Sequence, residues 1–382
     1  MSTVDSDEPG RRRQLRVVAR QFTAREIVPH LTDWEDAGRV PGSLHVSAAE
    51  AGLLGAGFPE AVGGSGGLFL DYLAVVEEVI LAGGSSGLLA ALFTHSIALP
   101  HLIASGDTCL VDRYVRPTLT GKSIGCLAVT EPDGGSDVAA IRTTARRDGE
   151  HLVVNGAKTF ITSGVRADFA TVVVRTGGPG RSGISLLLVD ARTPGFTVTR
   201  QLDKMGWHCS DTAELSFVDA RVPATNLIGA EGSGFAQLMR HLATERISMA
   251  AQACAIAQRC VDLTLARCRE RSTFGAPLAS RQVVRHRLAE MARVTRVART
   301  FVWHVAAGVS AGRQRLTDVP MAKNTAVAAC AYVVDQAVQL HGGTGYLRES
   351  EVERHYRDSR MMGIGGGSTE IMNEVIATGL GL

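Results

Sequence analysis

A glutamate on an apolar helix face is the strongest candidate for acid–base chemistry in this sequence. Glu245 falls inside a stripe of apolar residues that recur every three or four positions, the spacing of one helix face: Phe235, Leu238, Leu242, Met249 and Ala253. Apolar surroundings raise the pKa of a carboxyl group toward the range in which its ionised form removes protons near neutral pH. The alternative interpretation is that Glu245 pairs with a neighbouring arginine and has a purely structural role.

Four other segments combine glycines with hydroxyl, aromatic or acidic side chains. They are Ala128–Asp137, Gly156–Gly164, Gln339–Tyr346 and Gly363–Glu370. Glycines let backbone N–H groups approach a ligand closely, and a glycine run leading through Ser or Thr into a helix can present those groups to an anion or a carbonyl oxygen. In the second segment, Phe160 and Thr162 are two residues apart on a predicted strand and therefore share a face. Each segment alone also fits an ordinary turn, strand, helix cap or linker.

Helices precede these segments. Residues 11–122 have helical spacing, with a break predicted at Gly83–Gly84. His95 lies in a strongly apolar stretch, where we expect a hydrogen-bonded core histidine rather than a functional one.

The pattern changes near residue 123 to short apolar or alternating runs rich in Val, Ile, Thr and Phe, which predict an antiparallel β domain. The predicted strands are 125–130, 151–155, 158–162, 169–175, 183–189, 196–200 and 213–218. Asp148–Gly149 and Asn155–Gly156 are predicted turns between strands.

Helical spacing returns after Gly234. Long helices are predicted at 235–268, 279–311 and 318–341, and a fourth starts at Thr369. We therefore predict an α+β fold with an N-terminal helical domain (1–122), a middle antiparallel β-barrel domain (123–232) and a C-terminal four-helix bundle (233–382).

Composition excludes several classes of protein. The chain has 382 residues, 45% of them apolar, and a net charge of +2, which is too small to indicate binding to nucleic acid. Its seven cysteines form no CxxC pair, so neither a metal site nor a disulfide framework is expected. The N-terminus has no apolar run behind its basic cluster, and no stretch is apolar for long enough to cross a bilayer. These features predict a cytoplasmic protein without an integral membrane segment.

Taken together, the four segments resemble the acyl-CoA dehydrogenase family. Ala128–Ala140 and Gln339–Asp358 match the two sequence signatures of that family in full, and Lys204–Thr212 and Arg271–Gly275 are also similar to it. The resemblance covers nearly the whole chain, in the order and spacing of the family. It implies a three-domain fold, FAD as cofactor, an acyl-CoA substrate, electron-transfer flavoprotein as electron acceptor, and a homo-oligomer, usually a tetramer.

The resemblance also implies roles for individual residues. Those that match flavin contacts within one subunit are Thr130, Ser136, Phe160, which covers a flavin face, and Thr162, which bonds flavin N5. Those that match contacts to the FAD of a neighbouring subunit are Arg271, Phe274, Gln282, Gln339 and Gly343. Ser368 and Glu370 match the last FAD contacts, and Ser136 and Arg246 are candidates for binding substrate.

The chain departs from most of the family at the catalytic base. Where most members have a Glu in the C-terminal loop, this chain has Gly366. Isovaleryl-CoA and long-chain acyl-CoA dehydrogenases also lack that Glu and carry the base immediately before an Arg on the first long helix after the β domain. Glu245-Arg246 matches that place, so we predict Glu245 as the base and the backbone N–H of Gly366 as a donor to the thioester carbonyl. Glu370 is the rival acid.

The acyl group remains open. The missing side chains of Gly365–Gly367 favour room for a long or branched acyl group. Two other activities compete with acyl-CoA oxidation on the same fold: dehydrogenation of an acyl group on a carrier protein, and flavin-dependent monooxygenation or oxidation. A non-catalytic member is a further alternative.

Overall fold

The computed structural model describes residues 8–313 and 315–382. Residues 1–7 of the predicted N-terminal domain lie outside the described residues. They are part of the N-terminal segment from which no secretory signal is expected.

The N-terminal part of the chain is helical, as predicted. Its helices are α1 (Gly10–Phe22), α2 (Leu31–Asp36), α3 (Gly42–Glu50), α4 (Phe69–Leu81), α5 (Ser86–Leu92), α6 (His95–Ala98), α7 (Pro100–Ser105), α8 (Thr108–Leu110) and α9 (Arg116–Leu119). The predicted break lies between α4 and α5, where Gly83 has a φ of +105° and a Cβ on Gly84 would come within 2.8 Å of the Val79 carbonyl oxygen. Only glycine fits such a turn without moving the backbone.

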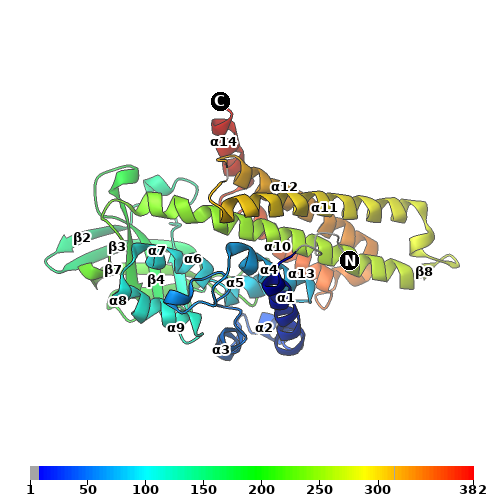
Figure 1. The fold of residues 1–382 in the computed structure, drawn as a ribbon, viewed down its shortest axis with the longest axis horizontal. Coiled ribbons are helices and arrows are strands. Elements are labelled where there is room, and N and C mark those ends of the chain that lie inside the picture. Colours follow the sequence, from blue (N-terminus) through cyan, green and yellow to red (C-terminus); the bar gives the residue numbers. More distant parts are fainter. Residues whose placement is uncertain (1–7, 314) are drawn as a thin grey trace.

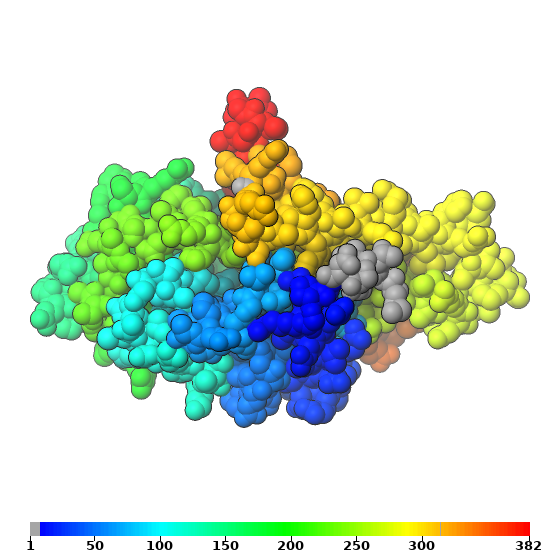
Figure 2. Space-filling model, viewed as in Figure 1, coloured from blue at the N-terminus to red at the C-terminus, as the bar shows by residue number. Residues whose placement is uncertain are grey.

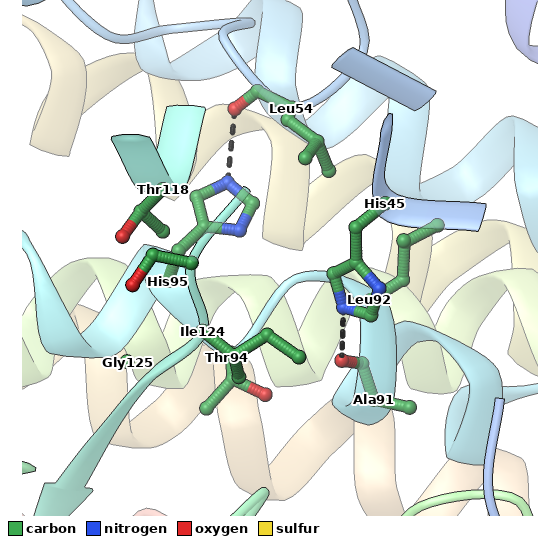
Figure 3. A pocket seen from close by; sticks show the side chains of 10 residues that line it. His45, Leu54, Ala91, Leu92, Thr94, His95, Thr118, Ile124 and Gly125 are labelled. Atoms are coloured by element: carbon green, nitrogen blue, oxygen red, sulfur yellow. Dashed lines mark hydrogen bonds between the residues drawn. The ribbon is translucent and has the colours of Figure 1, made fainter. Parts of the chain in front are cut away.

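His95 is a core histidine, as expected. Its Nε2 lies 2.9 Å from the carbonyl oxygen of Leu54, and the nearby His45 Nε2 lies 3.2 Å from that of Ala91 (Figure 3). Burial lowers the pKa of both rings to about 4, so both are neutral near pH 7.

The middle of the chain forms a curled sheet with the order β1-β4-β2-β3-β7-β6, and β5 pairs with β4. The strands are β1 (Gly125–Ala128), β2 (Thr144–Asp148), β3 (His151–Thr162), β4 (Phe169–Arg175), β5 (Ile184–Asp190), β6 (Phe196–Gln201) and β7 (Thr212–Pro223). Most neighbours are antiparallel, but β4 runs parallel to β1 and, at one register position, to β2. The sheet is therefore mixed rather than purely antiparallel.

Two details of the predicted strands are wrong. Strand β2 was not predicted, because three of its five residues are exposed and no apolar alternation marks it. Asn155–Gly156 is not a turn but a bulge inside the continuous strand β3, where the register with β7 shifts. A Cβ on Gly156 would lie 2.5 Å from Thr143 Oγ1, so the glycine permits close strand packing.

The C-terminal part consists of long helices, as predicted. They are α10 (Gly234–Glu270), α11 (Gln282–Ser310), α12 (Asp318–His341), the unpredicted α13 (Glu351–Ser359) and α14 (Thr369–Gly379). The first three pack against one another, and α14 packs on α12. A short hairpin, β8 (Ser272–Thr273) and β9 (Ala276–Pro277), joins α10 to α11 at the end of the molecule opposite the sheet (Figure 1).

One hydrophobic cluster joins the N-terminal and C-terminal helices. It contains Leu73 of α4, Ala253 of α10, Val302 of α11 and Val333 of α12. Separate clusters fill the sheet and the contact between the sheet and the helices α7 to α9. Helix α14 and the β8–β9 end project from this body (Figure 2).

No single helix in the described ranges is long and apolar enough to cross a membrane. By length and composition alone, one bent pair among the residues searched, Ser86–Leu92 and His95–Ser105 at 56° to each other, meets that criterion.

Candidate active site

Glu245 lies on α10 beside the glycine loop that precedes α14. A Cβ placed on Gly366 would be 3.6 Å from Glu245 Oε1, so the structure brings together the predicted base and the predicted carbonyl donor. Burial raises the pKa of Glu245, while the positive charges of Arg246 and Lys323 act in the opposite direction. A partly desolvated carboxylate of this kind is suited to proton removal.

Two cations hold the three carbonyl groups of the glycine loop. Lys323 of α12 donates from Nζ to the carbonyl oxygens of Gly365 and Gly367, at 2.6 and 2.5 Å. Arg246 donates from Nε to the carbonyl oxygen of Gly366 at 2.8 Å. The N–H group of Gly366 has no acceptor within the described residues. The loop therefore offers a free N–H donor next to Glu245.

Methionines fill the space beside this loop. A Cβ on Gly365 would lie 2.7 Å from Met361 Cε, one on Gly366 would lie 3.0 Å from Met249 Sδ, and one on Gly367 would lie 2.7 Å from Met372 Cε. The three glycines therefore pack against the flexible ends of methionine side chains. Gly366 and Gly367 also have φ angles of +64° and +98°, which L side chains rarely adopt.

A second group of predicted residues lies on the sheet. Thr130 follows β1, and its carbonyl oxygen accepts a hydrogen bond from the N–H of Thr159 in β3, next to Phe160. Phe160 has a φ of +59° and is 68% exposed. The register of β3 with β7 shifts between Lys158 and Ile161. Ile161 is buried, whereas Phe160 is exposed and Thr162 is half-buried on either side of it. Ser136 is exposed on the loop after Thr130.

A buried ion pair beneath this turn was missed in the sequence. Lys158 is fully buried and donates to Glu131 Oε1 at 2.9 Å and to the Val129 carbonyl oxygen at 3.0 Å. The Glu131 carboxylate also accepts the N–H groups of Arg142 and Thr143. Burial lowers the pKa of Lys158 to about 8. The pair fixes the backbone on both sides of Thr130. The sequence feature that could have indicated it is a lysine and a glutamate of opposite charge inside two of the glycine-containing segments.

The remaining predicted cofactor residues divide into two places. Ser368 accepts the N–H of Ile371 at the start of α14, and Glu370 is exposed in the first turn of that helix. Three more of the predicted cofactor residues lie at the opposite end of the long helices. Arg271 is the residue that follows α10, and Gln282 begins α11. Phe274, at the tip of the hairpin between them, is 98% exposed.

Gln339 and Gly343 lie at this same end of the bundle. Arg267, near the end of α10, donates to Thr344, the residue after Gly343. Neither Gly342 nor Gly343 is forced by packing, since a Cβ at either would meet nothing within 4 Å. Arg271 is separated from Glu245 by roughly 40 Å of α10, at about 1.5 Å per residue. Within a single chain, the residues at the Arg271 end of the bundle therefore cannot contact a ligand that is bound beside Glu245.

Two of the family-like segments have a structural role. Asp358 of α13 accepts the N–H of Trp207 at 2.7 Å and that of Gly87 at 3.3 Å, and Trp207 Nε1 donates to Ser86. This contact joins the N-terminal helices, the loop before β7 and the C-terminal helices at one point.

Comparison with known families covers the same three parts of the chain. Residues 10–122, 126–220 and 232–381 match the models of the acyl-CoA dehydrogenase N-terminal, middle and C-terminal domains, respectively. The chain belongs to the acyl-CoA dehydrogenase family. The family prediction made from the motifs is confirmed, and so is the expectation of an FAD-binding oxidoreductase that acts on acyl-CoA.

Individual relatives of this acyl-CoA dehydrogenase family member agree. The chain is 38% identical over 365 residues to the probable acyl-CoA dehydrogenase YngJ of Bacillus subtilis, covering 95% of this chain and 96% of the relative. A probable acyl-CoA dehydrogenase structure from Mycobacterium abscessus has 61% identity and a TM-score of 0.97, covering 97% of this chain and 99% of that one. A glutaryl-CoA dehydrogenase from Mycobacterium smegmatis in complex with FADH2 has 27% identity and a TM-score of 0.92, covering 99% and 96%.

Proposed function

We propose that this protein introduces a double bond between the α and β carbons of an acyl-CoA thioester, with Glu245 removing the α proton. The observation that carries the proposal is that Glu245 Oε1 lies 3.6 Å from the position of a Cβ on Gly366, a residue whose N–H has no acceptor within the described residues. FAD, when bound, supplies the acceptor for the hydride that leaves the β carbon.

Glu245 provides the base. Its raised pKa reflects a carboxylate that loses hydration, which increases its basicity relative to an exposed glutamate. The positive charges of Arg246 and Lys323 oppose this rise by favouring the ionised form. The proton moves from the α carbon to a carboxylate oxygen of Glu245.

Gly366 acidifies that α proton. A backbone N–H that bonds the thioester oxygen stabilises the negative charge that develops there as the proton leaves, as an oxyanion hole does. This requires no side chain, which is why a glycine can replace the Glu of other family members without losing this contribution.

The residues around Thr130 fit an isoalloxazine ring and its chain. The exposed ring of Phe160 offers a flat apolar surface, and Thr162 and Ser136 offer hydroxyl groups. The exposed group at Arg271, Phe274, Gln282, Gln339 and Gly343 would complete the FAD site of a second copy, because it is too far away to serve its own. The proposal therefore includes a homo-oligomer, with a tetramer as the expected form.

An electron acceptor and a location complete the proposal. Electron-transfer flavoprotein receives the electrons, and the reaction takes place in the cytoplasm. An acyl group carried on a carrier protein is the second candidate substrate class, since Glu245 and Gly366 act on the thioester alone and make no contact that requires CoA.

Anaerobic mixing of the FAD-loaded protein with straight and branched acyl-CoAs tests the function. We expect the visible flavin band to bleach rapidly with one subset of chain lengths. If no acyl-CoA bleaches the flavin but an acyl carrier protein thioester does, the substrate is an acyl group on a carrier protein rather than an acyl-CoA. Absence of bleaching with both would contradict the proposal. Oxygen consumption during turnover would indicate the oxidase or monooxygenase alternative.

A further inference from the structure

We propose that Lys323 is a positioning residue: it fixes the peptide between Gly365 and Gly366 so that the Gly366 N–H faces the thioester oxygen. This inference rests on the proposed function and goes beyond it, because within the described residues the hydrogen bonds of Lys323 go to carbonyl oxygens of the loop backbone.

The contacts of Lys323 are specific. Its side chain reaches from α12 to two carbonyl oxygens that are two residues apart, those of Gly365 and Gly367, while Arg246 takes the carbonyl between them. All three successive carbonyl groups are thus bonded to a cation, and two different helices provide the donors. Charged donors form stronger hydrogen bonds than neutral ones, so this arrangement opposes rotation of each peptide.

Peptide geometry converts these contacts into an orientation. In a planar trans peptide the C=O of one residue and the N–H of the next point in opposite directions. Since the carbonyl of Gly365 points to Lys323, the N–H of Gly366 must point away from Lys323. That N–H has no acceptor in the described part of the chain, and its residue lies against Glu245.

A run of three glycines needs such a constraint. Glycine crosses between regions of φ and ψ at little cost, so an unconstrained Gly365–Gly367 loop would sample other peptide orientations. Lys323 is only 1% exposed, and burying an ammonium group is costly unless its hydrogen bonds are satisfied. The carbonyl groups of Gly365 and Gly367 accept two of its three N–H donors, and the charged groups that face it are Glu245 and Arg246.

The test uses Lys323→Met, Lys323→Gln and the matched control Asn324→Ala. Methionine has a side chain of similar length to lysine but donates no hydrogen bond. Glutamine has a shorter side chain, which we expect to reach only one of the two carbonyl oxygens. Asn324 also connects α12 to the C-terminal segment, through the Thr369 carbonyl oxygen and Asn373, without touching the three loop carbonyls.

The probes are octanoyl-CoA and 3-thiaoctanoyl-CoA. In the second, sulfur replaces the β carbon, so the α proton can be removed but no hydride can leave, and the resulting anion beside oxidised FAD gives a long-wavelength band. The titration of this band with pH reports how well the site stabilises the anion. Burial lowers the pKa of Lys323 to about 8, so the variants are compared on the part of the plateau below that pH, where Lys323 keeps its charge and Glu245 is ionised. This comparison separates the positioning effect from the influence of the lysine charge on Glu245.

For Lys323→Met we expect normal FAD content, analogue affinity within about threefold of wild type, and a plateau band and kcat lowered about 10- to 100-fold at nearly unchanged KM, short of the loss typical of a deleted oxyanion donor. Lys323→Gln should lie in between, and Asn324→Ala should match wild type. Unchanged plateau and kcat in Lys323→Met would overturn the proposal. If Lys323→Met does not fold, an unchanged plateau in Lys323→Gln would overturn it. If wild type bleaches with another acyl-CoA of the panel but not with octanoyl-CoA, the same comparison is made with that acyl-CoA and its 3-thia analogue. If wild type bleaches with no acyl-CoA and forms no band, the proposed function fails, and the role of Lys323 fails with it.

Discussion

Glu245 and Gly366 occupy the two sides of one small space, with 3.6 Å between Glu245 Oε1 and the position of a Cβ on residue 366. A base on α10 and a base on the C-terminal loop would therefore reach the same point. In the proposed site, Gly366 therefore costs the chain no carboxylate, since α10 provides one at the same place.

Replacing Glu245 by Gln should abolish flavin reduction by substrate while FAD remains bound. Gln keeps the shape of the side chain but cannot accept the α proton, and loss of a general base typically costs about 100- to 10,000-fold in rate. Stopped-flow bleaching measures the effect. The matched variant is Glu370→Gln, which removes the rival acid and should still bleach; bleaching by Glu245→Gln together with loss in Glu370→Gln would reverse the two roles.

The rate of flavin reduction should fall on acidification at a pH above the ordinary glutamate pKa of 4.5, because burial raises the pKa of Glu245 and only its ionised form is a base. Arg246→Met removes a charge that lowers this pKa, so it should move the acid limb to higher pH. Arg240→Met, on an exposed position of the same helix, is the control. A limb that stays in place in Arg246→Met, measured by bleaching rate against pH, would show that Glu245 does not set it.

Lys158→Met should destabilise the protein by about 3–5 kcal/mol, since it leaves the Glu131 carboxylate buried without its cation. Urea unfolding of the FAD-loaded protein measures the loss, and Lys158→Met/Glu131→Gln should recover part of it. Lys122→Met, at an exposed position, is the control. Because the pKa of Lys158 is lowered from 10.5 to about 8, the unfolded chain binds the extra proton between these values, and the contribution of Lys158 to stability rises with pH across that window. A single variant as stable as wild type would show that the pair is not needed.

Phe274→Ala should lower FAD affinity and weaken self-association. A fully exposed aromatic tip is unfavourable in an isolated chain, and aromatic anchors at interfaces commonly contribute about 2 kcal/mol or more, which is more than tenfold in affinity. FAD content after gel filtration and sedimentation velocity measure the two effects. Val218→Ala, an exposed apolar position on β7, should change neither. Equal FAD retention by Phe274→Ala and wild type would argue against a shared site.

The sequence predicted the long helices well because each buries one face over many turns. The predicted 318–341 agrees with α12, and the predicted 235–268 differs from α10 by only one or two residues at each end. Strand β2 was invisible because its neighbours, not its own side chains, determine its pairing. The role of Lys323 could not be predicted either, since it depends on two carbonyl groups more than 40 residues away. The one available signal was a lysine among small apolar residues of a helix.

The length of α10 has a genetic consequence. In the proposed oligomer each chain gives Glu245 to its own active centre and Arg271 to that of its neighbour. A chain carrying Glu245→Gln and a chain carrying Arg271→Ala would each be inactive alone. Co-expressed, they would form mixed pairs in which one centre has both defects and the other has none, so two dead alleles would complement each other.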